Sequence, residues 1–418
     1  MDSTPETVSR ARRYLAGLTR NVFVLGLVSF FTDISSEMIV PVRILFLVGV
    51  LGTPLPVAGL IEGLAESASS LLKIASGQWS DRVTSRKPMI FAGYTISNLA
   101  KPVLAIVATW QQALGLILLE RVGKGTRTSP RDALMADSTP AAYRGKAFGF
   151  HRSMDTLGAA VGPLLTTAIL LATSNNLRAV FAWTIVPGVI SVVLILLFLR
   201  EVPRVQAARR AQAAAVPKES RRERMARLGT PFWLFTAVAT VFALGNSSDA
   251  FIFLRSEGLE HSLAVVPLMY FGYNVVYALL ATPLGALSDR WGRLPVLAAG
   301  YFAFAVVYAG WAAATQGWQA WALFLVYGLY AAATEGVGKA LVVDVAPSGE
   351  RGAALGWYNG VTGFAALPAN IIGGWLWSLY GPGATFVFGA WAGFAAAALL
   401  LAWLPWLRRA AQARAAQP

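Results

Sequence analysis

Acidic side chains occur in pairs inside long apolar stretches of the sequence. Asp33 and Glu37 lie four residues apart in FFTDISSEMIVP, and Glu62 and Glu66 repeat that spacing. Residues four apart share one face of a helix, so each pair predicts two neighbouring carboxylates. Ionisable groups are costly inside a membrane span and generally mark a pathway. We therefore expect these acids to take part in proton coupling or to line a central cavity.

Basic residues lie in similar stretches and are candidate charge partners for these acids. Arg121 is the favoured partner, and Asp155 is a further candidate for the proton site. A conformational change that alters the distance between a buried carboxylate and a cation can load or release a proton. A structural interpretation competes with this one, because permanently paired charges can simply fix the register of helices. The sequence leaves both interpretations open.

The composition excludes most other kinds of site. Of 418 residues, 56% are hydrophobic and only 13% are charged, whereas a soluble domain carries about 25% charged residues. The chain has no cysteine and two histidines, which predicts no disulfide framework and no metal centre. No phosphate-binding loop of the G-x-x-x-x-G-K-[ST] type occurs. We therefore expect a non-enzymatic integral membrane protein without metal or cofactor.

Long apolar runs define the predicted elements, because a bilayer core needs about 20 mostly apolar residues per helix. The predicted spans are 21–48, 55–77, 88–109, 112–137, 144–172, 177–199, 231–254, 264–287, 294–314, 319–345, 351–376 and 384–406. The predicted fold is therefore an all-α membrane protein with twelve transmembrane helices.

Charge distribution predicts the orientation of these spans. The 35 Lys and Arg exceed the 21 Asp and Glu by 14, and the bases gather in alternate connections, which is typical of cytoplasmic loops. This excess of basic residues therefore indicates how the protein is oriented in a membrane. It does not indicate a nucleic-acid partner. We expect both termini in the cytoplasm. The predicted organisation is an N-terminal segment 1–20, a six-helix bundle 21–199, a basic cytoplasmic linker 200–230, a second six-helix bundle 231–407 and a cytoplasmic tail 408–418.

The two bundles repeat one another in sequence. The segment from Gly77 to Arg82 matches the segment from Gly285 to Arg290 at a spacing of 208 residues. At a spacing of 207, Arg86 matches Arg293, Asp137 matches Asp344 and Arg144-Gly145 matches Arg351-Gly352. Two such repeats predict pseudo-symmetric halves with a substrate cavity between them near the middle of the membrane.

The repeated loop resembles the signature of the major facilitator superfamily. Its residues are Gly77, Asp81, Arg82 and Arg86 in the first copy and Gly285, Asp289, Arg290 and Arg293 in the second. Arg121-Val-Gly-Lys-Gly125 is similar to the family's R-x-x-x-G motif, and Gly158-Ala-Ala-Val-Gly162-Pro163 resembles the G-x-x-x-G-P motif of its drug/proton antiporters.

The resemblance implies roles for these residues. The repeated loops would form a cytoplasmic gate in which Asp81 meets the start of the eleventh helix and Asp289 the start of the fifth. The two loop glycines would allow close helix approach. Gly158, Gly162 and Pro163 would form a pivot associated with export, although small residues at this spacing also simply pack helices together.

The resulting hypothesis is a secondary active transporter that exports a small amphipathic compound in exchange for protons. Its expected partners are that compound, protons and the lipid bilayer, and we expect it to act as a monomer in a bacterial cytoplasmic membrane. Two alternatives stay open. One is a proton-coupled importer of a polar or anionic metabolite, favoured if Lys101, Arg121 and Arg152 form one binding site. The other is a non-transporting membrane receptor or scaffold.

Overall fold

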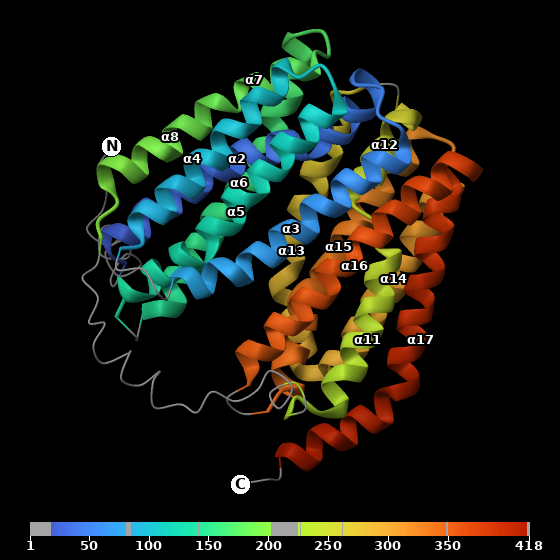
Figure 1. The fold of residues 1–418 in the computed structure, drawn as a ribbon. Helices are drawn as coiled ribbons and strands as arrows, with labels where there is room; N and C mark the ends of the chain where they lie inside the picture. Colours follow the sequence, from blue (N-terminus) through green and yellow to red (C-terminus); the bar gives the residue numbers. More distant parts are fainter. Residues whose placement is uncertain are drawn as a thin grey trace, which may run out of the picture.

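The computed structural model describes residues 18–80, 85–140, 143–201, 225, 227–260, 262–347 and 350–415. These residues form helices and connecting turns, and no strand occurs among them. The predicted all-α class is therefore confirmed for this part of the chain. The helices fall into an N half and a C half (Figure 1).

The N half contains seven helices in this part of the chain. They are α2 (Arg20–Leu45), α3 (Leu55–Ser80), α4 (Lys87–Val103), α5 (Trp110–Asp137), α6 (Arg144–Ala172), α7 (Leu177–Trp183) and α8 (Ile185–Phe198). A π-helical turn, Phe46–Val50, extends α2, and a short 3-10 turn, Leu104–Ile106, follows α4. Thr184 lies between α7 and α8, and Pro187 in the first turn of α8 lacks the N–H that would bond to the preceding turn.

The C half contains seven helices among the described residues. They are α11 (Gly229–Gly245), α12 (Asp249–Glu260), α13 (Val265–Trp291), α14 (Arg293–Ala313), α15 (Gly317–Val345), α16 (Arg351–Tyr380) and α17 (Pro382–Ala415).

Each predicted span coincides with one helix or with two consecutive helices. Nine of these helical stretches in the described chain are long and apolar enough to cross a membrane. The three that do not reach this hydropathy are α3, α5 and α16, and the first two carry several of the intramembrane charges noted above. That all twelve spans cross the bilayer, with both termini in the cytoplasm, stays a prediction.

One predicted span differs from the structure in a way that affects the site. The range 231–254 was expected to be a single helix, but the helix stops at Gly245 and resumes at Asp249. The intervening Asn246, Ser247 and Ser248 favour turns, because their side chains compete for backbone hydrogen bonds. The Asn370 Oδ1 atom accepts the backbone N–H of Ser248 at 2.7 Å and replaces one missing helical bond.

The side-chain hydrogen bonds at one helix start repeat in the two halves, as the sequence does. The side-chain oxygen of Gln112 accepts the backbone N–H groups of residues 108 and 109 where α5 begins. Gln319 accepts those of residues 315 and 316 where α15 begins, 207 residues later. Each glutamine thus satisfies N–H groups that the first turn of a helix leaves without partners.

An ion pair between the third and fourth helical stretches of each half also repeats. Arg86 contacts Asp137 at 2.5 Å, and Arg293 contacts Asp344 at 3.2 Å. Within each half the helices joined by this pair also pack together, α4 on α5 and α14 on α15. The sequence repeat therefore corresponds to a repeat in packing and in charge pairing.

The two halves touch mainly through α3 with α16, α6 with α13, and α2 with α12. A Cβ added at Gly59 would stand 2.2 Å from the Asn370 carbonyl oxygen, and one at Gly374 would stand 2.5 Å from that of Leu55. The contact continues to Ser67, whose hydroxyl donates to the Gly363 carbonyl oxygen at 3.0 Å. Beyond this point α3 and α16 diverge toward the lower left of Figure 1.

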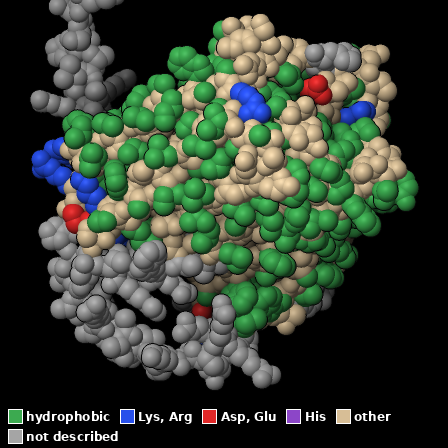
Figure 2. Space-filling model, turned by 45° about the horizontal axis from the view of Figure 1, so that its top comes forward, with side chains coloured by type: hydrophobic (Ala, Val, Ile, Leu, Met, Phe, Trp, Pro, Cys, Tyr) green, Lys and Arg blue, Asp and Glu red, His purple; other side chains and the backbone are tan. Residues whose placement is uncertain are grey.

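The outer surface has the character expected in lipid. Large apolar side chains are widely exposed, including Ile106 at 80%, Leu171 at 71% and Trp391 at 70%. Hydrophobic side chains cover most of the face seen in Figure 2, and the few charged ones lie toward its margins. Exposed apolar area on this scale indicates a membrane interface.

Candidate functional site

A cavity of about 810 Å³ lies between the two halves. Glu62, Glu66 and Arg121 line it, which brings together three residues that the sequence singled out. Asp33, Glu37 and Asp155 do not line it. The sequence-predicted site residues therefore fall into two groups, one at the cavity and one beside it.

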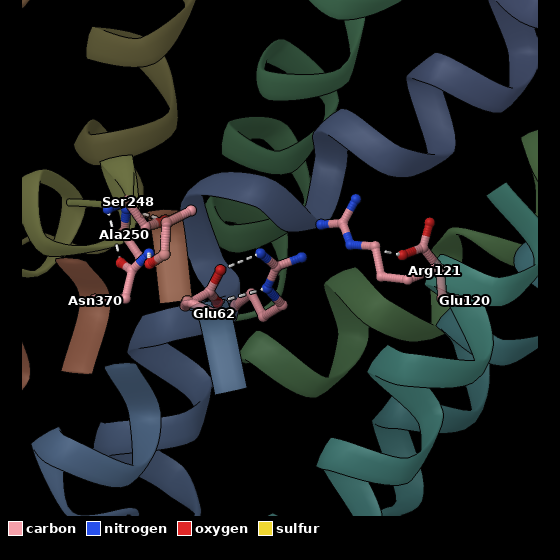
Figure 3. A network of polar contacts seen from close by, with 8 residues as sticks. Glu62, Glu120, Arg121, Ser248, Ala250 and Asn370 are labelled. Carbon is pink, nitrogen blue, oxygen red and sulfur yellow. Dashed lines mark hydrogen bonds and ion pairs between the residues drawn. The ribbon is translucent and has the colours of Figure 1, made fainter. Parts of the chain in front are cut away.

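Glu62 forms an ion pair with Arg43 at the cavity wall (Figure 3). The Arg43 Nε atom donates to Glu62 Oε1 at 2.7 Å, and a second guanidinium nitrogen donates to Oε2. Both side chains are almost completely buried. The pair joins α2 to α3, and removing either partner would leave an uncompensated charge in a low-dielectric environment.

Arg121 has a different ion-pair partner from the one expected. Its Nε atom lies 3.3 Å from Glu120 Oε2 on the same helix, α5 (Figure 3). Lys124 lies one turn further along the same helix. Because residues three apart share a helix face, Arg121 and Lys124 both line the cavity.

Asp33 and Glu37 face α6, where they contact the glycines of the G-x-x-x-G-P motif. A Cβ added at Gly158 would stand 3.0 Å from Asp33 Cβ, and one at Gly162 would stand 2.8 Å from Glu37 Cβ. The motif glycines thus let α6 approach α2 at the level of the paired acids. Pro163 follows within the same helix.

Glu37 also reaches the other half of the molecule. The Tyr270 hydroxyl on α13 donates to Glu37 Oε2 at 3.0 Å. Tyr270 stacks on Tyr273, and Tyr273 on Tyr277, with ring centroids 5.5 and 6.4 Å apart. The Tyr277 hydroxyl donates to Glu335 Oε2 at 2.9 Å. One face of α13 therefore links a carboxylate of the N half to one of the C half.

Asp155 and Lys101 occupy polar surroundings within the N half. The Asp155 carboxylate lies 3.5 Å from His151 Nδ1 on α6. Lys101 on α4 is fully buried, and its Nζ donates to Ser36 Oγ at 2.8 Å and to Asn98 Oδ1 at 2.9 Å. Lys101 does not line the cavity, and neither does Arg152. The structure therefore does not gather Lys101, Arg121 and Arg152 into one anion site.

The broken helix adds site residues that the sequence reasoning did not select. Asp249, the first residue of α12, lines the cavity and accepts a hydrogen bond from the Tyr327 hydroxyl at 2.7 Å. Asn370 stabilises the break between α11 and α12 by accepting the Ser248 N–H, and it lies beside Ser248 and Ala250 in Figure 3. The sequence signal was Asn-Ser-Ser-Asp directly after a glycine, a helix-breaking pattern inside an apolar run.

Only part of the two proposed gate loops lies within the described residues. Asp81 and Arg82 lie outside the described residues, and so do the surroundings of Gly77. Asp289 pairs with Arg293 of its own half at 2.6 Å and is 62% exposed. Arg290 is likewise exposed, at the end of α13. A Cβ at Gly285 would meet nothing within 4 Å, so close helix packing does not explain this glycine here.

The two halves differ in the chemistry of equivalent positions. At a spacing of 207 residues, Lys101 corresponds to Tyr308 and Glu120 to Tyr327. The C half buries these rings in an aromatic cluster, in which the centroids of Phe304 and Tyr308 lie 4.0 Å apart. The N half places ion pairs and buried charges in the same location. Around the cavity itself, the N half contributes Arg43, Arg121 and Lys124, whereas the C half contributes aromatic rings such as Phe242, Tyr301 and Tyr330 together with Asp249, Glu335 and Lys339.

The sequence profile of the Major Facilitator Superfamily matches residues 25–269 and 251–417. An MFS-type transporter of Methanocaldococcus jannaschii is 34% identical over 379 residues, covering 89% of this chain and 92% of that protein. A probable 4-methylmuconolactone transporter of Cupriavidus pinatubonensis is 26% identical over 263 residues, covering 60% of this chain and 56% of that one.

Solved transporter structures share the fold. A POT family transporter in complex with 5-aminolevulinic acid superposes with a TM-score of 0.76 at 12% identity, covering 93% of this chain and 96% of that one. A bacterial homologue of the lysosomal transporter Spinster gives a TM-score of 0.70 at 15% identity, covering 98% of each chain. Since the family profile spans nearly the whole chain, the protein belongs to the Major Facilitator Superfamily of membrane transporters, as its motifs predicted.

Proposed function

We propose that the protein is a proton-coupled exporter of a small amphipathic organic compound that works by alternating access. The observation that supports this most directly is the position of Glu37. It contacts Gly162 of the antiporter-type motif on one side and receives the Tyr270 hydrogen bond from the other half on the other. A carboxylate at such a junction can exchange a proton when the two halves move relative to one another.

The separation of the two acidic pairs fits this mechanism. Asp33 and Glu37 lie beside the cavity against α6, whereas Glu62 and Glu66 line the cavity itself. Protons and cargo would then bind at neighbouring sites, and both sites would respond to the same rearrangement. Asp155 would belong to the proton site, because it lies on α6, the helix that Asp33 faces at Gly158.

The conformation is the inward-facing one if the base-rich connections face the cytoplasm, as the sequence predicts. The contacts between α3 and α16 then close the outer side, from Leu55 with Gly374 to Ser67 with Gly363. The gate pairs of Asp81 and Asp289 with the other half would form only when the cytoplasmic side closes. We expect the protein to work as a monomer in the cytoplasmic membrane of a bacterium.

Proton flux in inverted membrane vesicles tests this function. Vesicles with an acidic interior and a pH-sensitive dye would receive amphipathic amines, organic anions, sugars and amino acids, one at a time. Wild-type protein should release protons only with its cargo, whereas Asp33→Asn and Glu37→Gln should abolish this release but still exchange cargo for cargo. Glu257→Gln on α12 is the matched control, because it does not line the cavity. Wild-type pH dependence in both acid variants would refute the proposed proton site.

An importer of an anionic metabolite is the second candidate. Two observations favour it: Arg121 and Lys124 line the cavity, and a relative is a probable transporter of 4-methylmuconolactone. Cargo-dependent alkalinisation on the outside of whole cells, rather than proton release from inverted vesicles, would identify this mode.

A further inference from the structure

The two arginines of the N half that line the cavity have acidic partners within that half. Arg43 is bonded to Glu62, and Arg121 lies beside Glu120. Paired charges of this kind offset the cost of burial for one another, so these two arginines have little uncompensated positive charge to offer to a cargo.

The C half contributes a carboxylate in the opposite situation. Asp249 accepts the Tyr327 hydroxyl, but no ion pair joins it to a base among the described residues. The other charged side chains of the C half that line the cavity are Glu335 and Lys339. Asp249 is therefore a carboxylate at the cavity wall without an ion-pair partner among the described residues.

Aromatic rings surround this part of the cavity. Phe242, Tyr301 and Tyr330 line it, and the rings of Phe242 and Tyr301 are stacked with centroids 4.0 Å apart. Ring faces attract organic cations in addition to burying apolar surface. A small metal cation prefers several oxygen ligands, so this lining fits an organic ammonium group better than an alkali ion.

The break between α11 and α12 supplies an independent sign of a ligand. Ser247 lines the cavity, is 4% exposed, and its Oγ has no hydrogen-bond partner within the described chain. Buried polar groups normally have a partner. In addition, α11 ends at Gly245, and the C-terminus of a helix carries partial negative charge. Both features suit a ligand with N–H donors and positive charge.

We propose that the cavity binds the ammonium group of an aromatic or aliphatic amine, with Asp249 as its counter-ion, the Ser247 hydroxyl as a hydrogen-bond acceptor, and Phe242, Tyr301 and Tyr330 against its apolar body. This assignment rests on the proposed transport function and specifies its cargo. It brings together two features of the C half at the cavity, which are the aromatic rings and a carboxylate without an ion-pair partner among the described residues.

Binding by three isosteric probes tests the assignment without any ion gradient. The full chain in lipid nanodiscs would be titrated with a phenylalkylamine and with the alcohol and the carboxylate of the same chain length. The amine should bind about tenfold more tightly than the alcohol, which corresponds to about 1.4 kcal/mol. Asp249→Asn should abolish this preference, and Glu257→Gln on the same helix should keep it.

The controls separate the possible outcomes. Asp249→Glu keeps the charge and should retain the preference for the amine, which shows that loss in Asp249→Asn is not a folding defect. Equal binding of amine and alcohol, tighter binding of the carboxylate, or displacement of the amine by sodium ions alone would each overturn the assignment. Proton release is measured separately in vesicles, so a failure of proton coupling with an intact amine preference would contradict only the proposed exchange mechanism.

Discussion

Glu37 and Gly162 lie directly against one another where α2 crosses α6. A Cβ at position 162 would stand 2.8 Å from Glu37 Cβ and 3.0 Å from the Ile34 carbonyl oxygen. The glycine of an export-type motif is thus in direct contact with the acid that we propose carries the proton. The motif can act on coupling by controlling how closely these two helices approach.

Gly162→Ala should therefore impair both packing and proton coupling. The added methyl group forces α6 away from Glu37, and overpacking of this kind costs about 1–3 kcal/mol. We expect lower survival on heating in detergent, measured by size-exclusion chromatography, and loss of cargo-dependent proton release. Gly149→Ala on the same helix is the control, since a Cβ there meets nothing within 4 Å. Equal behaviour of the two variants would contradict the contact's role.

Tyr270→Phe should change the balance between conformations. The variant removes the hydroxyl that donates to Glu37 across the two halves but keeps the stacked ring. A hydrogen bond of this kind contributes about 0.5–1.5 kcal/mol, which corresponds to a change of about two- to tenfold in the conformational equilibrium. We expect the inward-facing form to become less populated.

Thiol labelling measures this shift, because the natural chain contains no cysteine. Asn359→Cys would place a single thiol at the cavity. Labelling from the cytoplasmic side should slow when Tyr270→Phe is added, and it should stay unchanged with Tyr380→Phe, whose ring is exposed. An unchanged labelling rate in Tyr270→Phe would show that this bond does not favour the inward-facing form.

Breaking the pair of Arg43 and Glu62 should destabilise the N half strongly. Glu62→Gln leaves the Arg43 charge buried without compensation, at a cost of about 3 kcal/mol. Replacing both residues with apolar ones of similar volume, in Arg43→Met with Glu62→Leu, should restore much of the heat survival but not transport. A single variant as stable as wild type would indicate that water reaches the pair through the cavity.

Asp289→Asn should slow transport without affecting folding. Arg293 keeps Asp344 as a partner in this variant, so the local ion pair persists. The carboxylate would be needed only when the cytoplasmic side closes and Asp289 reaches the start of α6. The measurements are expression level and transport rate at saturating cargo, with Glu257→Gln as the matched control. A wild-type rate would remove Asp289 from the proposed gate.

The sequence by itself was sufficient for the features that depend on local pattern. Long apolar runs predicted the helices, and the register of 207 residues matched Arg86 to Arg293 and Asp137 to Asp344, which form equivalent ion pairs in the structure. Spacing of four residues predicted that Asp33 and Glu37 share a helix face, and both do face α6. Hydrophobicity and helical periodicity are properties of a few neighbouring residues, so no tertiary contact is needed to read them.

Tertiary structure decided which acid faces which partner. Helix rotation depends on packing against neighbouring helices, and this packing turned Glu62 toward the cavity and Arg43 while turning Glu37 toward Gly162 and Tyr270. It also brought Asn370 to Ser248, 122 residues away, and so stabilised the break that exposes Asp249 to the cavity. Contacts between residues so distant in the chain carry no periodic signal, and only the assembled fold determines them.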